Sequence, residues 1–173
     1  MKVTIFNAIS IDGYIATNED DTSWVNDTEY FEKEIKNNDA IIYGRRTYDD
    51  LVSLEYFPYE GIKNIIYTSA PNKYTNEVNI EFTNLEPEKL IRQLEYQGHK
   101  NILIAGGGKT NATFIEADLV DEVIVDVHPI ILGSGIKLFE KDDLAVKLEL
   151  VTTKKLNAGI VQLRYKIIKE NVE

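Results

Sequence analysis

The chain has 173 residues, of which 43% are hydrophobic and 28% charged, so it is long enough to bury a core and its composition is not that of a disordered protein. It has no cysteine and two histidines far apart, His99 and His128, which excludes disulfides and thiol nucleophiles and leaves no expected metal site. The formal net charge of −10 argues against a nucleic acid or an anionic membrane as partner, because both require a basic face.

The sequence also lacks the signals of a membrane or secreted protein. No apolar run approaches the roughly 18 residues that a membrane helix needs. No basic segment followed by an apolar one opens the chain. We therefore expect one domain over residues 1–173 and a cytoplasmic location.

The first elements surround an acidic loop. Residues 2–8 are rich in β-branched and aromatic side chains and predict a strand. Asp12-Gly13 is a turn dipeptide, and residues 14–16 predict a short extended piece. The acidic residues 18–22 that follow are either a solvated surface loop or a flap beside a site, and the sequence leaves both interpretations open.

Helical and extended patterns then alternate. Residues 28–36 predict a helix in which Phe31 and Ile35 lie one turn apart, with Asp27 or Thr28 as N-cap. Apolar runs and turn signals predict strands at 40–43, 64–68 and 78–83, and a helix at 45–54.

The carboxyl-terminal half changes character near its end. A helix is predicted between Pro87 and Gly98, which stand at a first turn and just after a last turn. Period-2 alternation in the final segment indicates two strands that each have one wet face, joined by a turn at 157–159. The remaining predicted elements are strands at 101–105, 121–128, 146–150 and 161–167, a helix at 110–117, and a loop at 129–137.

This order of elements predicts an α/β fold. Alternating strands and helices indicate a mostly parallel central sheet of about eight strands with helices on both faces. The two last strands predict a C-terminal antiparallel hairpin at its edge. In such sheets, ligands bind beyond the carboxyl ends of the parallel strands.

Two of these strand ends have anion-binding character. One carries Gly106, Gly107 and Gly108, which let a phosphate approach the backbone, and then opens a helix whose free N–H groups face the turn. The other carries Gly44-Arg45-Arg46-Thr47 at the start of a helix. Together they indicate a ligand with two separated phosphate groups, the shape of a dinucleotide. Taken singly, the glycines also suit a tight βα turn, the arginines a paired surface, and Trp24 the core.

The motifs in their order resemble the dihydrofolate reductase-like superfamily, and most closely the reductase domain of the bifunctional riboflavin-biosynthesis deaminase-reductase. The motifs that carry the resemblance are Ser10-x-Asp12-Gly13-x-Ile15-Ala16, Trp24, Gly44-Arg45-x-Thr47-Tyr48, the glycine triplet, Asp121-Glu122, Pro129-x-x-Leu132-Gly133-x-Gly135 and Leu138-Phe139.

The resemblance implies an NADPH-dependent reductase, and it implies roles for particular residues. Ala8 and Ile15 or Ala16 would border the nicotinamide, and Trp24 would lie in a loop near the cofactor. The adenosine 2′-phosphate and the pyrophosphate would be held by Gly44, Arg45, Arg46, Thr47 and Ser69, and the pyrophosphate also by Gly106, Gly107, Gly108, Lys109 and Thr110. Asp12 and Asp27 are the candidate catalytic residues. Family analogy and the apolar late strands further predict a homodimer.

Departures from the family pattern leave the substrate open. Ala105 stands where the riboflavin branch usually has an acidic residue, and the region after Trp24 offers acidic residues instead of the arginines that would grip a ribose phosphate. Asp27 is either a substrate-binding acid or an N-cap. The preferred hypothesis is a reductase acting on 5-amino-6-(5-phosphoribosylamino)uracil or a similar heterocycle. The alternatives are a dihydrofolate reductase-like pterin reductase that uses Asp27, and a non-catalytic NADPH-binding module.

Overall fold

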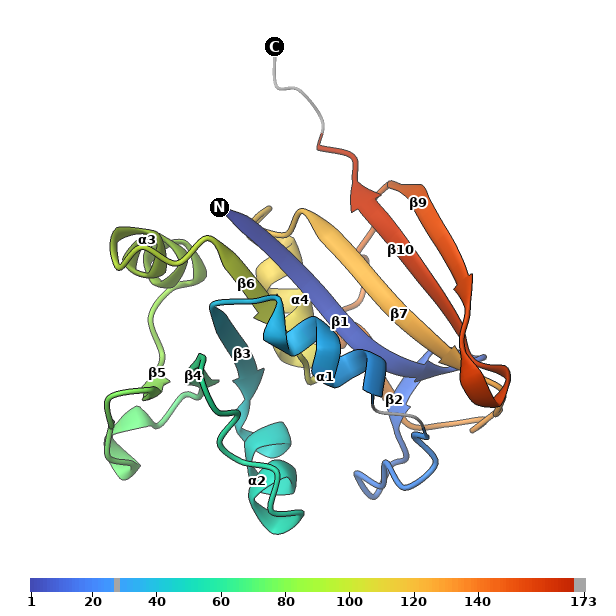
Figure 1. Cartoon of the computed structure of the whole chain (residues 1–173), viewed down its shortest axis with the longest axis horizontal. Coiled ribbons are helices and arrows are strands. Elements are labelled where there is room, and N and C mark those ends of the chain that lie inside the picture. The colour runs from blue at the N-terminus through green and yellow to red at the C-terminus, as the bar shows by residue number, and fades with distance from the viewer. Residues whose placement is uncertain (27–28, 170–173) are drawn as a thin grey trace.

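An eight-stranded mixed sheet forms the centre of the computed structural model, which describes residues 1–26 and 29–169 (Figure 1). Its strand order is β5-β4-β3-β6-β1-β7-β10-β9. The strands from β5 to β7 pair in parallel, and β10 and β9 complete the sheet as an antiparallel hairpin. The strand bounds are β1 (Lys2–Ser10), β3 (Ala40–Gly44), β4 (Lys63–Tyr67), β5 (Ile80–Thr83), β6 (Asn101–Ile104), β7 (Glu122–His128), β9 (Leu148–Lys155) and β10 (Val161–Ile167). The predicted α/β fold is confirmed.

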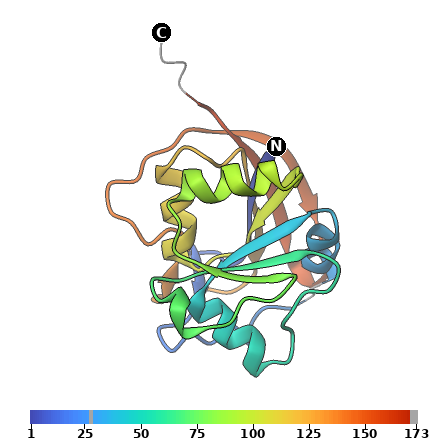
Figure 2. The ribbon, with the colours of Figure 1, turned by 90° about the vertical axis from the view of Figure 1, so that its left-hand side faces the viewer.

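Helices cover both faces of this sheet, as the alternation of elements predicted. On one face, α3 (Pro87–Tyr96) and α4 (Gly108–Glu116) bury Leu90, Leu94 and Phe114 against the strands. On the other face lie α1 (Glu29–Lys36) and α2 (Arg45–Ser53), whose apolar side chains contact a second cluster of buried residues. Figure 2 shows α1 and α3 on opposite sides of the sheet.

The central strands are buried because nearly every residue in them is apolar. Ile41 and Ile42 in β3, and Ile65 and Ile66 in β4, point to opposite faces, and all four are fully buried. A strand that is covered by helices on both faces needs such a continuous apolar run. Burial of each of these side chains contributes roughly 1.5 to 3 kcal/mol to folding.

No helix in the described part of the chain is long and apolar enough to cross a bilayer.

Several predicted boundaries differ from those of the structure. β1 runs two residues further than expected, to Ser10, and α4 begins at Gly108 instead of residue 110. The predicted loop 129–137 contains a short strand, β8 (Ile136–Lys137), which pairs with β2 (Tyr14–Ala16) in a separate ribbon. Ile136 and Lys137 form a strand because they pair with β2, which is distant in the sequence, so the local sequence does not indicate it.

β9 differs most from its prediction. Alternation suggested one wet and one dry face, yet every residue of this strand is exposed. The physical reason is its position: β9 is an edge strand that pairs only with β10 in the sheet order. Leu148, Leu150 and Val151 consequently remain 41 to 53% exposed.

Asp39 joins β3 to β6 and gives the fold a testable pH dependence. Its Oδ2 accepts hydrogen bonds from the backbone N–H groups of Lys100 (2.7 Å) and Asn101 (2.8 Å). These bonds, led by that from Lys100, hold the pKa of the Asp39 carboxyl below its ordinary value of 3.8. Because the folded-state pKa is lowered, the stabilisation is complete above 3.8 and is lost as the pH falls through the folded value.

We therefore expect Asp39→Ala to lower the free energy of unfolding by about 1 kcal/mol at pH 7, a value discounted for the exposure of this side chain. Urea titrations of both proteins at neutral and acidic pH measure the difference. The gap between the two proteins should narrow as the pH falls below 3.8. A gap that stays constant down to acidic pH would show that the charge of Asp39 is not the cause.

Candidate functional site

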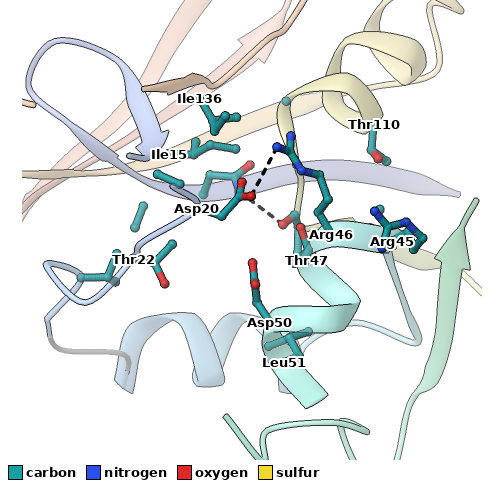
Figure 3. A pocket seen from close by; sticks show the side chains of 18 of the residues that line it. Ile15, Asp20, Thr22, Arg45, Arg46, Thr47, Asp50, Leu51, Thr110 and Ile136 are labelled. Atoms are coloured by element: carbon teal, nitrogen blue, oxygen red, sulfur yellow. Dashed lines mark hydrogen bonds and ion pairs between the residues drawn. The ribbon is translucent and has the colours of Figure 1, made fainter. Parts of the chain in front are cut away.

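A cleft of about 940 Å³ opens at the carboxyl ends of the parallel strands (Figure 3). Residues from the ends of β1, β3, β4, β6 and β7 line it, together with the first turns of α2 and α4 and parts of the acidic loop after β2. All these strand ends meet at one edge because the strands are parallel. The cleft therefore lies where the topology of an open α/β sheet favours a ligand.

Two helices begin at this cleft with free N-termini. The N-cap of α2 is Gly44 and that of α4 is Gly107, and neither residue has a side chain to cap the helix. The first N–H groups of a helix have no partners within it, and the helix dipole adds partial positive charge there. Each N-terminus can therefore accept an anion.

The two helix N-termini are held directly beside each other. The N–H of Gly44 donates to the carbonyl oxygen of Gly106 at 2.8 Å. A Cβ on Gly44 would lie 2.7 Å from the hydroxyl oxygen of Thr110, and a Cβ on Gly107 would lie 3.8 Å from that of Thr47. One extended ligand can therefore contact both turns at once.

Positive side chains flank these turns. Arg45, Arg46 and Lys109 all line the cleft. Figure 3 shows Arg46 reaching across to Asp20 of the acidic loop, with an Nη2–Oδ2 distance of 3.3 Å. Arg45 pairs with Asp49 one turn further along α2. Both arginine side chains are about half exposed, at 48 and 53%, so these ion pairs are weak and can exchange for a phosphate.

The mouth of the cleft is acidic. Asp20 and Asp21 of the loop line the cavity, as does Asp50 of α2. Burial raises the pKa of the Asp50 carboxyl, and the nearby charges of Asp20 and Asp49 raise it further. The acidic loop therefore lies beside the cleft as part of its wall.

The other end of the cleft is aromatic. Phe6, Phe31 and Tyr59 line it, with ring centroids 5.2 Å apart for Phe6 and Phe31 and 6.4 Å apart for Phe31 and Tyr59. Burial raises the pKa of the Tyr59 hydroxyl to about 12, so this group stays neutral at ordinary pH and can donate a hydrogen bond. Asp126 completes the wall from β7, and it is 5% exposed.

Most of the sequence-predicted cofactor residues meet at this one cleft. Its lining includes Ala8, Ile15, Ala16, Gly44, Arg45, Arg46, Thr47, Ser69, Gly107, Gly108, Lys109 and Thr110. Gly106 is not among the lining residues; its φ is +91°, and a Cβ on it would lie 2.9 Å from Nδ2 of Asn7. Trp24 is also outside the lining and packs its ring edge against His128, at a centroid distance of 5.4 Å.

Of the two candidate catalytic residues, the structure describes Asp12, which does not line the cleft. Asp12 is exposed and outside the lining, and its carboxylate accepts hydrogen bonds from the N–H groups of Leu132 (3.1 Å) and Gly133 (2.7 Å). A hydrogen bond with Ser10, together with these backbone bonds, lowers its pKa. Asp27 lies outside the described residues.

The comparisons with known proteins agree with this arrangement. The sequence pattern of the family described as RibD C-terminal domain matches residues 57–162, more than half of the chain. The uncharacterized protein YwjB of Bacillus subtilis (strain 168) is 34% identical over 173 residues, covering 95% of this chain and 97% of YwjB. The chain belongs to the RibD C-terminal domain family.

Solved structures share the fold of this RibD C-terminal domain. A pyrimidine reductase-like protein from Corynebacterium diphtheriae superposes with a TM-score of 0.77 at 18% identity, covering 98% of this chain and 92% of that protein. The diaminohydroxyphosphoribosylaminopyrimidine deaminase/5-amino-6-(5-phosphoribosylamino)uracil reductase from Thermotoga maritima gives a TM-score of 0.76 at 17% identity. In that pair the match covers 96% of this chain and 56% of the longer bifunctional protein.

Two features of the cleft of this RibD C-terminal domain depart from the pattern that the resemblance implied. Ala105 lines the cleft at the end of β6, where the resemblance implied a carboxylate. The described lining residues between Trp24 and β3 are Val25, Asn26 and Phe31, and none of them is cationic.

Sequence reasoning did not single out Asp126 or Tyr59. For Asp126 a signal was present, because a carboxylate in the middle of the apolar strand Val123-Ile-Val-Asp-Val127 needs a reason to be buried. Tyr59 lies in a segment that carries no pattern, and only the tertiary structure brings it to the cleft beside Phe31.

Proposed function

We propose that the protein is an NADPH-dependent reductase of a small heterocyclic compound, of the type found in riboflavin biosynthesis. The observation that supports it best is the pair of uncapped helix N-termini, held side by side by the hydrogen bond from Gly44 to Gly106 and flanked by cations. A dinucleotide needs this arrangement, since it carries a pyrophosphate and, in NADPH, a separate 2′-phosphate.

The residues of the cleft fit this cofactor. The pyrophosphate would lie against the N-terminus of α4, with Gly107, Lys109 and Thr110. The 2′-phosphate would lie at the N-terminus of α2, where Arg45 and Arg46 can exchange their exposed carboxylate partners for it. Ile15 and Ala16 would border the nicotinamide. Bound NADPH supplies a hydride, with its two electrons, to an electrophilic carbon of the substrate, and a proton from a neighbouring acid or from water completes the reduction.

The residues of the chain would position the substrate beside the nicotinamide and exclude water from the cleft. The aromatic end of the cleft can hold a flat ring next to the nicotinamide site, which shortens the path for the hydride. We assign Asp12 a positioning role, because its two backbone hydrogen bonds fix the segment that leads to β8 and Ile136 at the cleft. Homodimer formation and a cytoplasmic location stay predictions.

Titration with NADPH tests the proposal. Trp24 is the one tryptophan of the chain and belongs to the loop beside the cleft, so its fluorescence reports binding there. We expect saturable quenching by NADPH, and oxidation of NADPH in the presence of a suitable pyrimidine or pterin. A folded protein that shows no saturable binding would contradict the proposal. Binding without oxidation across pyrimidines, pterins and quinones would favour the non-catalytic module instead.

A further inference from the structure

Two asparagines are hydrogen-bonded to each other beside the glycine turn, residues 105–107. Nδ2 of Asn111, on α4, donates to Oδ1 of Asn7, on β1, at 2.9 Å. Nδ2 of Asn7 in turn donates to the carbonyl oxygen of Ala105 at 3.3 Å, one residue before Gly106. Asn7 lines the cleft, whereas Asn111 is fully buried and does not line it. Asn111 can therefore act on a bound ligand only through its neighbours.

Asn111 also holds the segment that follows β8. Its Nδ2 donates to the carbonyl oxygen of Leu138 at 3.0 Å. A second link lies close by, since the N–H of Glu140 donates to the carbonyl oxygen of Gly108 at 3.1 Å. The approach is tight, because a Cβ on Gly108 would overlap the carbonyl oxygen of Lys137. The first turn of α4 therefore packs directly against this segment.

The same segment is joined to the ribbon of β2 and β8. Lys137 of β8 pairs with Tyr14 of β2, and the N–H of Leu138 donates to the carbonyl oxygen of Gly13 at 3.2 Å. The residues that this ribbon contributes to the cleft lining are Ile15, Ala16 and Ile136. Under the proposed function, the ribbon borders the nicotinamide and the glycine turn holds the pyrophosphate. Asn111 thus connects the parts of the cleft assigned to the two halves of the cofactor.

The hydrogen-bonding groups of Asn111 indicate why an asparagine stands here. Its amide has two N–H donors, and they bond to Asn7 and Leu138. Its Oδ1 is buried and has no partner among the described residues. A buried acceptor without a partner lowers stability, and an apolar side chain of similar volume would avoid that loss. The two donated bonds are therefore what asparagine provides at this position.

We propose that Asn111 is a positioning residue for the cofactor, which fixes the spacing between the glycine turn and the ribbon of β2 and β8. The proposal rests on the proposed function and names a residue that acts without touching the ligand. NADPH spans both parts of the cleft, so it binds tightly only where their spacing matches its length. Without the two bonds the ribbon can shift, while the turn stays attached to β3 by the bond from Gly44 to Gly106.

Two ligands of different length test this role. Adenosine 2′,5′-bisphosphate carries the 2′-phosphate and the first 5′-phosphate of NADPH but no nicotinamide, so it can occupy the helix N-termini without reaching the ribbon. Calorimetry gives the dissociation constants of both ligands for the unmodified protein and for Asn111→Leu, which keeps the volume and loses the donors. We expect Asn111→Leu to weaken NADPH binding about tenfold and binding of the bisphosphate less than about twofold.

Two further variants separate positioning from stability. Ile115→Ala lowers stability from the same helix, because Ile115 is buried in the core and lies outside the cleft lining. Below its unfolding temperature, this control should leave the ratio of the two dissociation constants unchanged. Asn111→Ser serves as the second test where Asn111→Leu does not fold. It keeps one hydroxyl donor and should shift the ratio in the same direction by a few-fold.

The outcomes separate the inference from the proposed function. An unchanged ratio in a folded Asn111 variant, or equal losses for both ligands, would overturn the positioning role. A similar shift of the ratio in Ile115→Ala would also overturn it, since the ratio would then follow stability. A folded, unmodified protein that binds neither ligand would instead contradict the proposed function.

Discussion

Replacing Arg45 and Arg46 together by glutamine is expected to weaken NADPH binding roughly 100-fold, because two charge-assisted contacts with the 2′-phosphate are lost at about 1.4 kcal/mol each. Glutamine keeps much of the side-chain length and a hydrogen-bond donor but not the charge. NADH has no 2′-phosphate, so its affinity should change far less. The measurement is the ratio of the two dissociation constants, obtained by fluorescence titration.

Two control variants bracket this result. Arg92→Gln removes an exposed cation of α3, away from the cleft, and should change neither affinity. Asp20→Asn removes the carboxylate that competes for Arg46, and should tighten NADPH binding by a few-fold, the worth of an exposed ion pair. Equal losses for NADPH and NADH in the double variant would show that the arginines do not recognise the 2′-phosphate.

Gly107→Ala is expected to weaken NADPH and NADH equally, by roughly 10- to 100-fold, since an added methyl group in a closely packed site costs about 1 to 3 kcal/mol. In the free protein the new Cβ would meet only ordinary contacts, 3.8 Å from the hydroxyl oxygen of Thr47 and 3.9 Å from Cδ1 of Ile15. The backbone of Gly107, at φ −68° and ψ −166°, is one that alanine adopts. The fold should therefore persist while the space between the two phosphate-binding turns is filled.

Thermal unfolding separates the loss of affinity from a loss of stability. The melting temperature of Gly107→Ala should stay within about 2 °C of that of the unmodified protein, which corresponds to less than about 1 kcal/mol at this chain length. Gly44→Ala provides the contrast, because its Cβ would lie 2.7 Å from the hydroxyl oxygen of Thr110 and should lower stability as well. Normal cofactor affinity in a stable Gly107→Ala would refute a pyrophosphate at this turn.

The sequence alone predicted those strands of the sheet well in which an apolar run of residues is also buried in the structure. Ile102, Leu103 and Ile104 form an apolar run that is buried in β6, and the glycines after them open a helix as expected. The prediction was wrong for β9, because period-2 alternation indicates which residues share a face but not whether anything covers it. β8 was missed for a related reason, since its two residues become extended only by pairing with β2.

The candidate site also contains residues that local sequence signals indicate and residues that only the tertiary structure brings together. Glycine turns and arginines at helix starts are local signals, so Gly107 and Arg45 could be assigned to one ligand-binding edge of the sheet from the sequence, and both line the cleft. Asp12 is a candidate catalytic residue by its turn motif. In the structure its carboxylate accepts hydrogen bonds from a segment some 120 residues later in the chain, a contact that no local pattern indicates. The aromatic end of the cleft depends on β1, α1 and the Tyr59 segment meeting in space, and no local pattern encodes that meeting.

The hydrogen bond between Gly44 and Gly106 joins segments that are neighbours in the sheet but 62 positions apart in sequence. A nucleotide that bridges them can bind only a chain in which β3 and β6 have already paired, so the unfolded ensemble has no affinity for it. Each tenfold excess of free cofactor over its dissociation constant then adds about 1.4 kcal/mol to the native state. Under the proposed function, the supply of reduced nucleotide would therefore help to determine how long each copy of this protein survives heat and proteolysis.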